Sequence, residues 1–427
     1  MAAESFTDAT LIVGASQAGV QLAASLRELG DARPIVLVGD EPHAPYQRPP
    51  LSKAYLAGTI TSDDLVFRTD AWFAEHDIDV VAGECVTLIE RTAGESGGVA
   101  VTSSGRRIPF ARLALATGAA PRRLELPGTD LAGVHYLRTA DDAAAIAEGL
   151  ARASSLVVIG GGFIGLEVAA ASRARGIAVT VLEAAPRLVG RVVSEQTSAF
   201  YLDAHRRRGI DVVLDARITA LTGSDAGAVT GVALDDGTVI DADVVLIGVG
   251  VVPRTELAEQ LGLEVDGGIV VDASCRTSDP AIVACGDCAI MPNPYARGSM
   301  PRVRLESVHN ALEQAKVAAA TLLCQSAEYR TTPWFWSDQA DLKLQIAGLS
   351  TGYDETVLRG DPATEKFSVL YYRDGQLIAA DCVNQPLDFM AVRAALGRGA
   401  EIPKSAAADT SVPLKKSVVE PAEPSLV

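Results

Sequence analysis

The chain has 427 residues and a formal net charge of −17, with 48% hydrophobic and 21% charged residues. This length is too great for one ordinary hydrophobic core, so we expect two or three domains in a globular protein. The negative charge argues against a nucleic acid or an anionic membrane as the main partner.

Neither export nor metal binding is predicted. No apolar run approaches the roughly 18–20 residues that span a bilayer, and Met1 to Thr10 lacks the basic start of a secretory signal. We therefore expect a cytoplasmic protein. The six cysteines and five histidines are scattered, which predicts neither a disulfide framework nor a metal site.

The first informative stretch is a short apolar run, Thr10 to Val13, followed by Gly14-x-Ser16-x-x-Gly19. This pattern is the dinucleotide-binding G-x-G-x-x-G with serine at the middle glycine. A helix is expected to Leu29, then a strand over 34–38 that ends near an acid. Asp40 is close to the position that binds a ribose hydroxyl, and Glu41 beside it could share that role.

A short antiparallel β region is expected over 80–110, with one strand at 81–86 and a turn at 105–109. A second buried strand, Leu113 to Ala116, then ends in Thr117-Gly118.

The second dinucleotide motif is complete. The apolar run Leu156 to Ile159 leads into glycines at 160, 162 and 165, a helix to Arg175 and a second strand at 178–182. Gly160 is expected to make the turn, Gly162 to admit a pyrophosphate and Gly165 to let the helix pack closely on the strand. Glu183 ends the second strand, where a carboxylate accepts from a ribose 2′-hydroxyl and repels a 2′-phosphate.

Two dinucleotide sites in one chain favour two different cofactors, and FAD with NAD(P)H is the natural pair because a flavin exchanges hydride with a nicotinamide. This pairing bears on the proline-rich segment 45–53. The segment is either a rigid connector with a solvated Lys53 or a rigid loop that holds Lys53 beside the flavin, paired with an acid.

Segment 282–289 has two interpretations. A strand leads into Cys285-Gly286-Asp287-Cys288 and, we expect, into a helix. The Cys-x-x-Cys spacing suits a redox-active pair. Alternatively, Asp287 caps the helix or accepts from a polyol hydroxyl, while both cysteines are small buried side chains. The apolar neighbours favour the second interpretation.

The rest of the chain is expected to contain helices at 192–208 and 304–323 and strands at 342–347, 367–372 and 376–383. Trp334 and Trp336 share one face if their segment is a strand. The tail from Ser405 has no periodicity and is expected to be extended or loosely packed.

Taken together, these motifs resemble the FAD-dependent, NADH-linked ferredoxin reductases that serve bacterial monooxygenases and ring-hydroxylating dioxygenases. The motifs that carry the resemblance are Pro-Tyr-Gln-Arg-Pro-Pro-Leu-Ser-Lys (45–53), Ala-Thr-Gly (116–118), Tyr-Leu-Arg-Thr (136–139), the glycine motif (159–169), Gly-Asp-Cys (286–288), Arg-Leu-Glu-Ser-Val (304–308) and Pro-Trp-Phe-Trp-Ser-Asp-Gln (333–339).

The resemblance implies an α/β, glutathione-reductase-like fold with two Rossmann-type dinucleotide-binding domains and a C-terminal α+β domain. The FAD domain would comprise 1–120 and 249–328, the NADH domain 121–248, and the α+β domain with an extended tail 329–427.

The resemblance also implies the site residues. Lys53 and Glu167 would form an ion pair beside the flavin, and Trp336 would stack near the isoalloxazine edge. The residues implied for FAD are Gly14, Ala18, Gly19, Asp40, Lys53, Val86, Arg138, Asp287 and Val308, and those for NADH are Gly160, Gly162, Gly165 and Glu183.

The implied activity is electron transfer from NADH through FAD to a 2Fe–2S ferredoxin, which supplies a monooxygenase or dioxygenase. One alternative is a disulfide reductase or peroxidase of the same fold, but 14–60 and 121–247 contain no cysteine to react with the flavin. Another is a non-enzymatic flavoprotein similar to apoptosis-inducing factors. For an acidic ferredoxin, Arg297, Arg302 and Arg304 are candidate docking residues.

Overall fold

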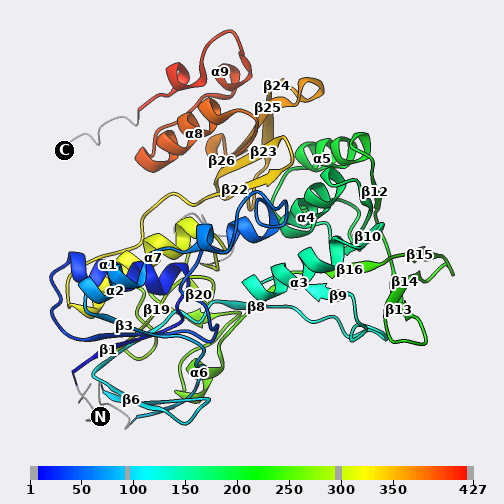
Figure 1. Ribbon diagram of the computed structural model, residues 1–427. Coiled ribbons are helices and arrows are strands. Elements are labelled where there is room, and N and C mark those ends of the chain that lie inside the picture. Colours follow the sequence, from blue (N-terminus) through cyan, green and yellow to red (C-terminus); the bar gives the residue numbers. More distant parts are fainter. Residues whose placement is uncertain (1–7, 92–96, 294–300, 421–427) are drawn as a thin grey trace. The chain divides into compact units, whose positions relative to one another are not determined.

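The computed structural model describes residues 8–91, 97–293 and 301–420. The chain divides into two compact units (Figure 1). The first unit holds residues 1–47, 63–120 and 251–331, and the second holds 48–62, 121–250 and 332–427.

The first unit is built on a five-stranded parallel sheet in the order β19-β7-β1-β2-β3. Its strands are β1 (Thr10–Val13), β2 (Ile35–Val38), β3 (Ile78–Val81), β7 (Arg112–Leu115) and β19 (Ile282–Ala284). Helices α1 (Gln17–Glu28) and α7 (Val308–Leu322) pack on each other, with fully buried alanines on α7 allowing close approach.

Shorter elements complete this unit. They are α2 (Asp70–Glu75), the antiparallel set β4 (Val86–Glu90), β5 (Gly98–Thr102) and β6 (Arg107–Phe110), β8 (Ala119–Pro121), β17 (Val251–Pro253), α6 (Glu256–Gln260), β18 (Ile269–Val270), β20 (Ala289–Pro292) and β21 (Arg302–Val303). The strand expected at 81–86 is wrong: β3 ends at Val81 and β4 begins at Val86, with Gly83 between them at a φ of 72°.

The second unit contains another parallel sheet, in the order β12-β11-β10-β16-β9. Its strands and helices are β9 (Val134–Tyr136), α3 (Ala140–Leu150), β10 (Ser155–Ile159), α4 (Phe163–Ala174), β11 (Ala178–Leu182), α5 (Glu195–Arg207), β12 (Ile210–Val213) and β16 (Val244–Ile247). An antiparallel set follows β12: β13 (Ile218–Gly223), β14 (Val229–Leu234) and β15 (Val239–Asp241).

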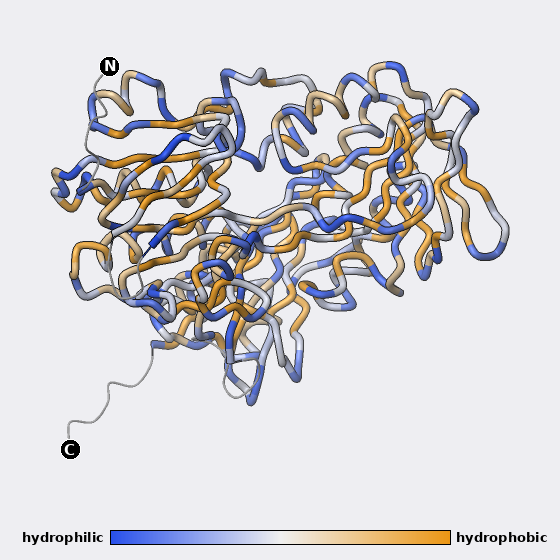
Figure 2. Tube along the Cα trace, turned by 90° about the horizontal axis from the view of Figure 1, so that it is seen from below, coloured by the Kyte–Doolittle hydropathy of each residue, from blue (hydrophilic) through white to orange (hydrophobic). Residues whose placement is uncertain are grey.

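An antiparallel sheet in the order β22-β23-β26-β25-β24 also belongs to this unit. Its elements are β22 (Trp334–Gln339), β23 (Leu342–Gly348), β24 (Glu355–Asp361), β25 (Lys366–Arg373), β26 (Gln376–Val383), α8 (Pro386–Arg398) and α9 (Lys404–Ala408). In Figure 2 the hydrophobic colour follows the strands of the sheets, as their burial requires.

The expectation of a loose tail is wrong for the residues that the structure describes. Ala407 is fully buried and Leu414 is 2% exposed in the core beneath α8. The guanidinium of Arg359, buried against Asp388, donates to the carbonyls of Ala407, Asp409 and Val412. Because these bonds come from a distant strand, local periodicity could not reveal them.

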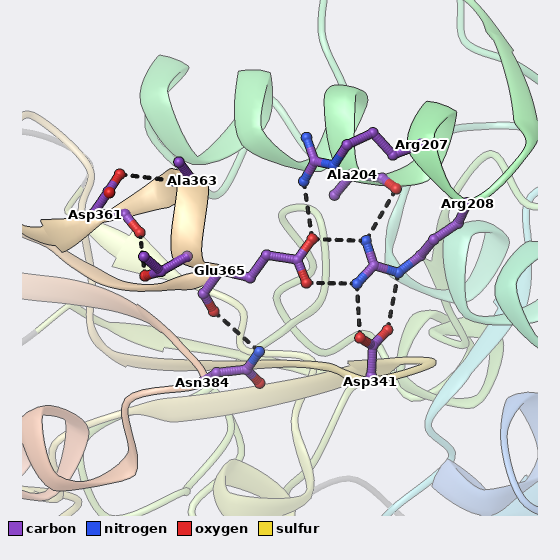
Figure 3. Close-up of polar contacts among 9 residues, drawn as sticks. Ala204, Arg207, Arg208, Asp341, Asp361, Ala363, Glu365 and Asn384 are labelled. Carbon is purple, nitrogen blue, oxygen red and sulfur yellow. Dashed lines mark hydrogen bonds and ion pairs between the residues drawn. The ribbon is translucent and has the colours of Figure 1, made fainter.

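Helix α5 is fixed at both ends, and Figure 3 shows the contacts at its C-terminal end. The Ser194 amide at its start donates to the buried Tyr371 hydroxyl at 2.6 Å. At its end, Arg208 forms paired bonds with Asp341 (2.9 and 2.8 Å) and with Glu365 (2.9 and 2.6 Å). The Arg208 and Glu365 side chains are only 22% and 25% exposed, so this contact is screened less than a surface ion pair.

We expect Arg208→Ala to lower the free energy of unfolding by about 1–2 kcal/mol, because two bidentate ion pairs are lost. Hydrogen bonds from Arg208 lower the pKa of Glu365 and of Asp341. This stabilisation is therefore complete above the ordinary values of 4.5 and 3.8 and is lost as the pH falls below them.

Urea unfolding of wild type and variant at several pH values measures this difference. Arg217→Ala is the matched control, because Arg217 is 82% exposed and lies 3.8 Å from Asp235. The prediction would be contradicted if Arg208→Ala lowered the free energy of unfolding no more than this control does.

Candidate functional site

The two parallel sheets each have a strand–turn–helix segment of the same design at the central strand. Gly14 follows β1 with a φ of 116°, and Gly160 follows β10 with a φ of 110°. A Cβ at Gly14 would lie 2.0 Å from the Ala116 carbonyl oxygen, and one at Gly160 would lie 2.4 Å from that of Gly248. Both first glycines are therefore required by the turn itself.

The third glycine of each motif lets the helix contact its own turn. A Cβ at Gly19 would lie 1.8 Å from the Gly14 carbonyl oxygen, and one at Gly165 would lie 2.2 Å from that of Gly160. Close packing of the helix therefore accounts for these two glycines, a role that the sequence predicted for Gly165.

The middle position differs from the other two. Gly162 is the N-cap of α4, and a Cβ built there meets no atom within 4 Å. Protein packing does not explain a glycine here, whereas a pyrophosphate brought against the amides of the helix N-terminus needs this space. Ser16 is the N-cap of α1 at the equivalent place, so the fold accepts a side chain at this position.

The predicted acids lie beside these turns. Glu183 accepts hydrogen bonds from the Gly161 amide at 2.6 Å and the Ala185 amide at 2.8 Å, which fixes its carboxylate against the glycine motif. Asp40 forms a 2.6 Å ion pair with Arg254, and both side chains are 39% exposed. The neighbouring Glu41 accepts from the Tyr46 hydroxyl.

Lys53 and Glu167 meet within the second unit. Lys53 follows the short helical turn Pro49–Ser52, and its ammonium lies 2.6 Å from Oε2 of Glu167 on α4. The Ser52 hydroxyl donates to the same oxygen at 2.5 Å. The carboxylate is 3% exposed, so a buried charge is compensated by neighbours from a distant segment. Of the two interpretations of segment 45–53, the structure excludes a solvated Lys53.

The turn that holds Asp287 packs against the start of α1. A Cβ at Gly286 would lie 3.0 Å from the Cβ of Ala18, so Ala18 and the Asp287 turn are brought together. The expected helix after Asp287 is wrong, since β20 follows instead. Asp287 is half-buried, and its carbonyl accepts from Arg304.

Sequence reasoning missed the support of this turn. Buried Gln314 on α7 accepts from the Gly286 amide at 2.8 Å, and Asn310 donates to the same Gln314 oxygen at 3.2 Å. The only available signal was a pair of amides four residues apart on an alanine-rich helix.

The other predicted FAD residues lie at element boundaries. Val86 begins β4, and Val308 begins α7 after the N-cap Ser307. The amide of Arg138 donates to Asp142, and its carbonyl accepts from Arg48.

The cysteines match the interpretation as small buried side chains. Cys285 and Cys288 are fully buried free thiols, and burial raises the pKa of each. The thiol of Cys288 contacts the Cys285 carbonyl oxygen at 3.3 Å. A buried thiol with a raised pKa is a poor nucleophile, which argues against a redox pair.

Trp336 is half-buried on β22, with its ring centroid 5.5 Å from that of Trp334, so the two rings share one face as expected. Phe335, which lies between the two tryptophans in the sequence, packs on Phe163, the first residue of α4, with ring centroids 4.7 Å apart.

The two candidate docking arginines that the structure describes are paired with acidic side chains. Arg302 pairs with Glu264 and Asp266, and Arg304 pairs with Glu306. Arg297 lies outside the described residues.

Comparison with known proteins identifies the family. Residues 8–315 match the pyridine nucleotide-disulphide oxidoreductase model, and residues 334–418 match the reductase C-terminal model. Rhodocoxin reductase of Rhodococcus erythropolis is 45% identical over 96% of this chain and 94% of its own.

Two crystal structures are also similar. A ferredoxin reductase from Rhodopseudomonas palustris is 41% identical with a TM-score of 0.91, covering 96% of this chain and all of that one. The covalent putidaredoxin reductase–putidaredoxin complex contains a chain 40% identical with a TM-score of 0.91, covering 96% of this chain and 97% of that one. This chain belongs to the ferredoxin reductase family of pyridine nucleotide-disulphide oxidoreductases.

Family membership makes the protein an oxidoreductase that uses FAD and NAD(P)H, with the predicted glutathione-reductase-like α/β architecture. The second glycine turn fits a dinucleotide, since the open space at Gly162 lies at a helix N-terminus. Among the described residues, no helix is long and apolar enough to cross a membrane, and no cluster of three metal-ligating side chains occurs.

We expect Gly162→Ala to raise the Michaelis constant for NADH about tenfold or more while leaving thermal stability almost unchanged, because the added methyl group meets no protein atom but fills the pyrophosphate space. Steady-state kinetics and thermal unfolding measure the two effects. Gly165→Ala is the matched control, and should lower stability because its Cβ would lie 2.2 Å from the Gly160 oxygen. Unchanged NADH kinetics in Gly162→Ala would contradict the assignment of this space.

Proposed function

We propose that this protein transfers electrons from NADH through FAD to a 2Fe–2S ferredoxin that supplies a bacterial cytochrome monooxygenase or ring-hydroxylating dioxygenase. The observation that carries the proposal is the pair of glycine turns in one chain, with the Lys53–Glu167 ion pair in place of a redox cysteine. The names of rhodocoxin reductase and of the putidaredoxin reductase–putidaredoxin complex support the same activity.

The proposed roles follow the site geometry. Bound FAD supplies the chemistry that takes two electrons from NADH and releases them one at a time to the ferredoxin. Gly14, Ala18, Gly19, Asp40, Val86, Arg138, Asp287 and Val308 bind and orient it in this proposal, and Gly160, Gly162, Gly165 and Glu183 bind NADH. Lys53, held by Glu167, favours negative charge on the isoalloxazine, and Trp336 covers its edge.

The proposal includes the domain assignment: 1–120 and 249–328 for FAD, 121–248 for NADH and 329–427 for the C-terminal domain. It also includes a cytoplasmic location, because NADH and the ferredoxin partner must both be accessible.

Anaerobic addition of NADH to the purified holoenzyme tests the activity. We expect rapid bleaching of the flavin absorbance, followed by reduction of an added 2Fe–2S ferredoxin. Bleaching without electron transfer to any ferredoxin would contradict the proposed acceptor, and absence of bleaching would contradict the activity as a whole.

Glu183 is expected to set the coenzyme preference. Glu183→Ala should raise the Michaelis constant for NADH about tenfold and relax discrimination against NADPH, because a ribose acceptor and a charge that repels a 2′-phosphate are removed. The Arg187 guanidinium, in the same segment, donates to the Gly190 and Val193 carbonyls at 2.6 and 3.0 Å.

Kinetics with both coenzymes measure the effect. Glu183→Gln is the matched control, because it keeps an acceptor for the Gly161 amide while it removes the charge and the acceptor for the Ala185 amide. Coenzyme kinetics unchanged in both variants would refute the role of Glu183.

A further inference from the structure

A buried chain of hydrogen bonds links Glu167 to helix α5. The Ser337 hydroxyl lies 2.6 Å from Oε1 of Glu167, and Nε2 of Gln339 lies 3.2 Å from the Ser337 hydroxyl. Oε1 of Gln339 lies 2.7 Å from Nε2 of His205. Ser337, Gln339 and His205 are fully buried, and nothing in the activity so far uses them.

The donors and acceptors along this series of hydrogen bonds can be assigned in only one direction. An ionised Glu167 only accepts, so Ser337 donates its single proton to it. The Ser337 oxygen then accepts from the Gln339 amide group, which turns the Gln339 carbonyl oxygen toward His205. His205 must donate from Nε2, so its neutral form carries the proton there and not on Nδ1.

We propose that Ser337, Gln339 and His205 are positioning residues: they form a one-way hydrogen-bond relay that orients the Glu167 carboxylate toward Lys53. This inference rests on the proposed function of the Lys53–Glu167 pair at the flavin. It adds three residues, on β22 and α5, that act on the flavin through that pair.

The surroundings of His205 support a neutral imidazole. Burial lowers its pKa, with a smaller contribution from the nearby Arg208 charge, while the bond to Gln339 acts in the opposite direction. Nδ1 has no hydrogen-bond partner among the described residues. A second N–H on this ring would therefore be buried without an acceptor.

The position of His205 is also fixed. It lies between the two anchors of α5, namely Ser194 on Tyr371 and Arg208 on Asp341, the second of which is drawn in Figure 3. Asp341 comes two residues after Gln339 and Arg208 caps α5, so the Arg208–Asp341 pair and the relay both link the C-terminal half of α5 to the end of β22.

With the relay in place, both oxygens of the Glu167 carboxylate accept hydrogen bonds. Lys53 and Ser52 donate to Oε2, and Ser337 donates to Oε1. Without Ser337, the carboxylate charge is compensated on one oxygen only. More negative charge then remains near Lys53 and opposes negative charge on the reduced isoalloxazine.

Ser337→Ala and Ser368→Ala provide a matched comparison. Both serines are fully buried in the same sheet and donate to a carboxylate, but Ser368 donates to Asp388, outside the relay. In the holoenzyme we expect Ser337→Ala to lower the flavin midpoint potential and to slow flavin reduction by NADH about tenfold, the loss expected for one hydrogen bond to a charge. Ser368→Ala should leave both unchanged. An unchanged potential in Ser337→Ala, or an equal shift in both variants, would overturn the proposal.

The direction of the relay is tested without turnover. In holoenzyme with ¹⁵N-labelled histidine, the His205 signals, identified by their loss in His205→Gln, should be those of a neutral ring protonated on Nε2. Gln339→Glu has nearly the same shape but places a carboxylate charge beside Nε2, which offsets the cost of a second N–H, so the doubly protonated form of His205 should gain population in that variant. A ring protonated only on Nδ1 in the wild type would refute the relay. A holoenzyme that NADH does not bleach would instead refute the proposed function, so the two failures are distinguishable.

Discussion

The buried carboxylate of Glu167 is the constraint around which the second unit is arranged. An uncompensated charge at this depth costs several kcal/mol, so donors must reach it from wherever the chain can supply them. They come from segment 48–62, through Ser52 and Lys53, and from β22, through Ser337. Segment 48–62 belongs to the second unit although its neighbours on both sides in the sequence belong to the first. The ion pair gives a physical reason for this excursion of the chain.

The two glycine turns separate requirements of the fold from requirements of the ligand. At the first and third positions an added Cβ would collide with backbone oxygens, so the fold alone demands glycine. At the middle position the protein leaves open space at Gly162 and accepts Ser16. A sequence motif mixes these two demands, whereas the structure assigns them to different positions.

Sequence reasoning succeeded where the determinants are local. The strands and helices of both dinucleotide motifs, the Glu183 position and the shared face of Trp334 and Trp336 follow from short-range periodicity. The pairing of Lys53 with Glu167 came from family resemblance, because no local pattern links residues so far apart. The packed tail, β24, and the support of the Asp287 turn by Gln314 were missed for the same reason.

The distribution of cysteine restricts how electrons can leave the protein. Segments 14–60 and 121–247 contain no cysteine, and Cys285 and Cys288 are buried thiols whose pKa is raised by desolvation. Passing a pair of electrons to a protein disulfide breaks the S–S bond and forms a thiolate, which burial disfavours here. A route from the bound cofactor directly to an external one-electron acceptor needs no such group, but it does need a fixed charge environment at the cofactor. The compensated Lys53–Glu167 pair, supported from both of its carboxylate oxygens, is suited to provide that environment.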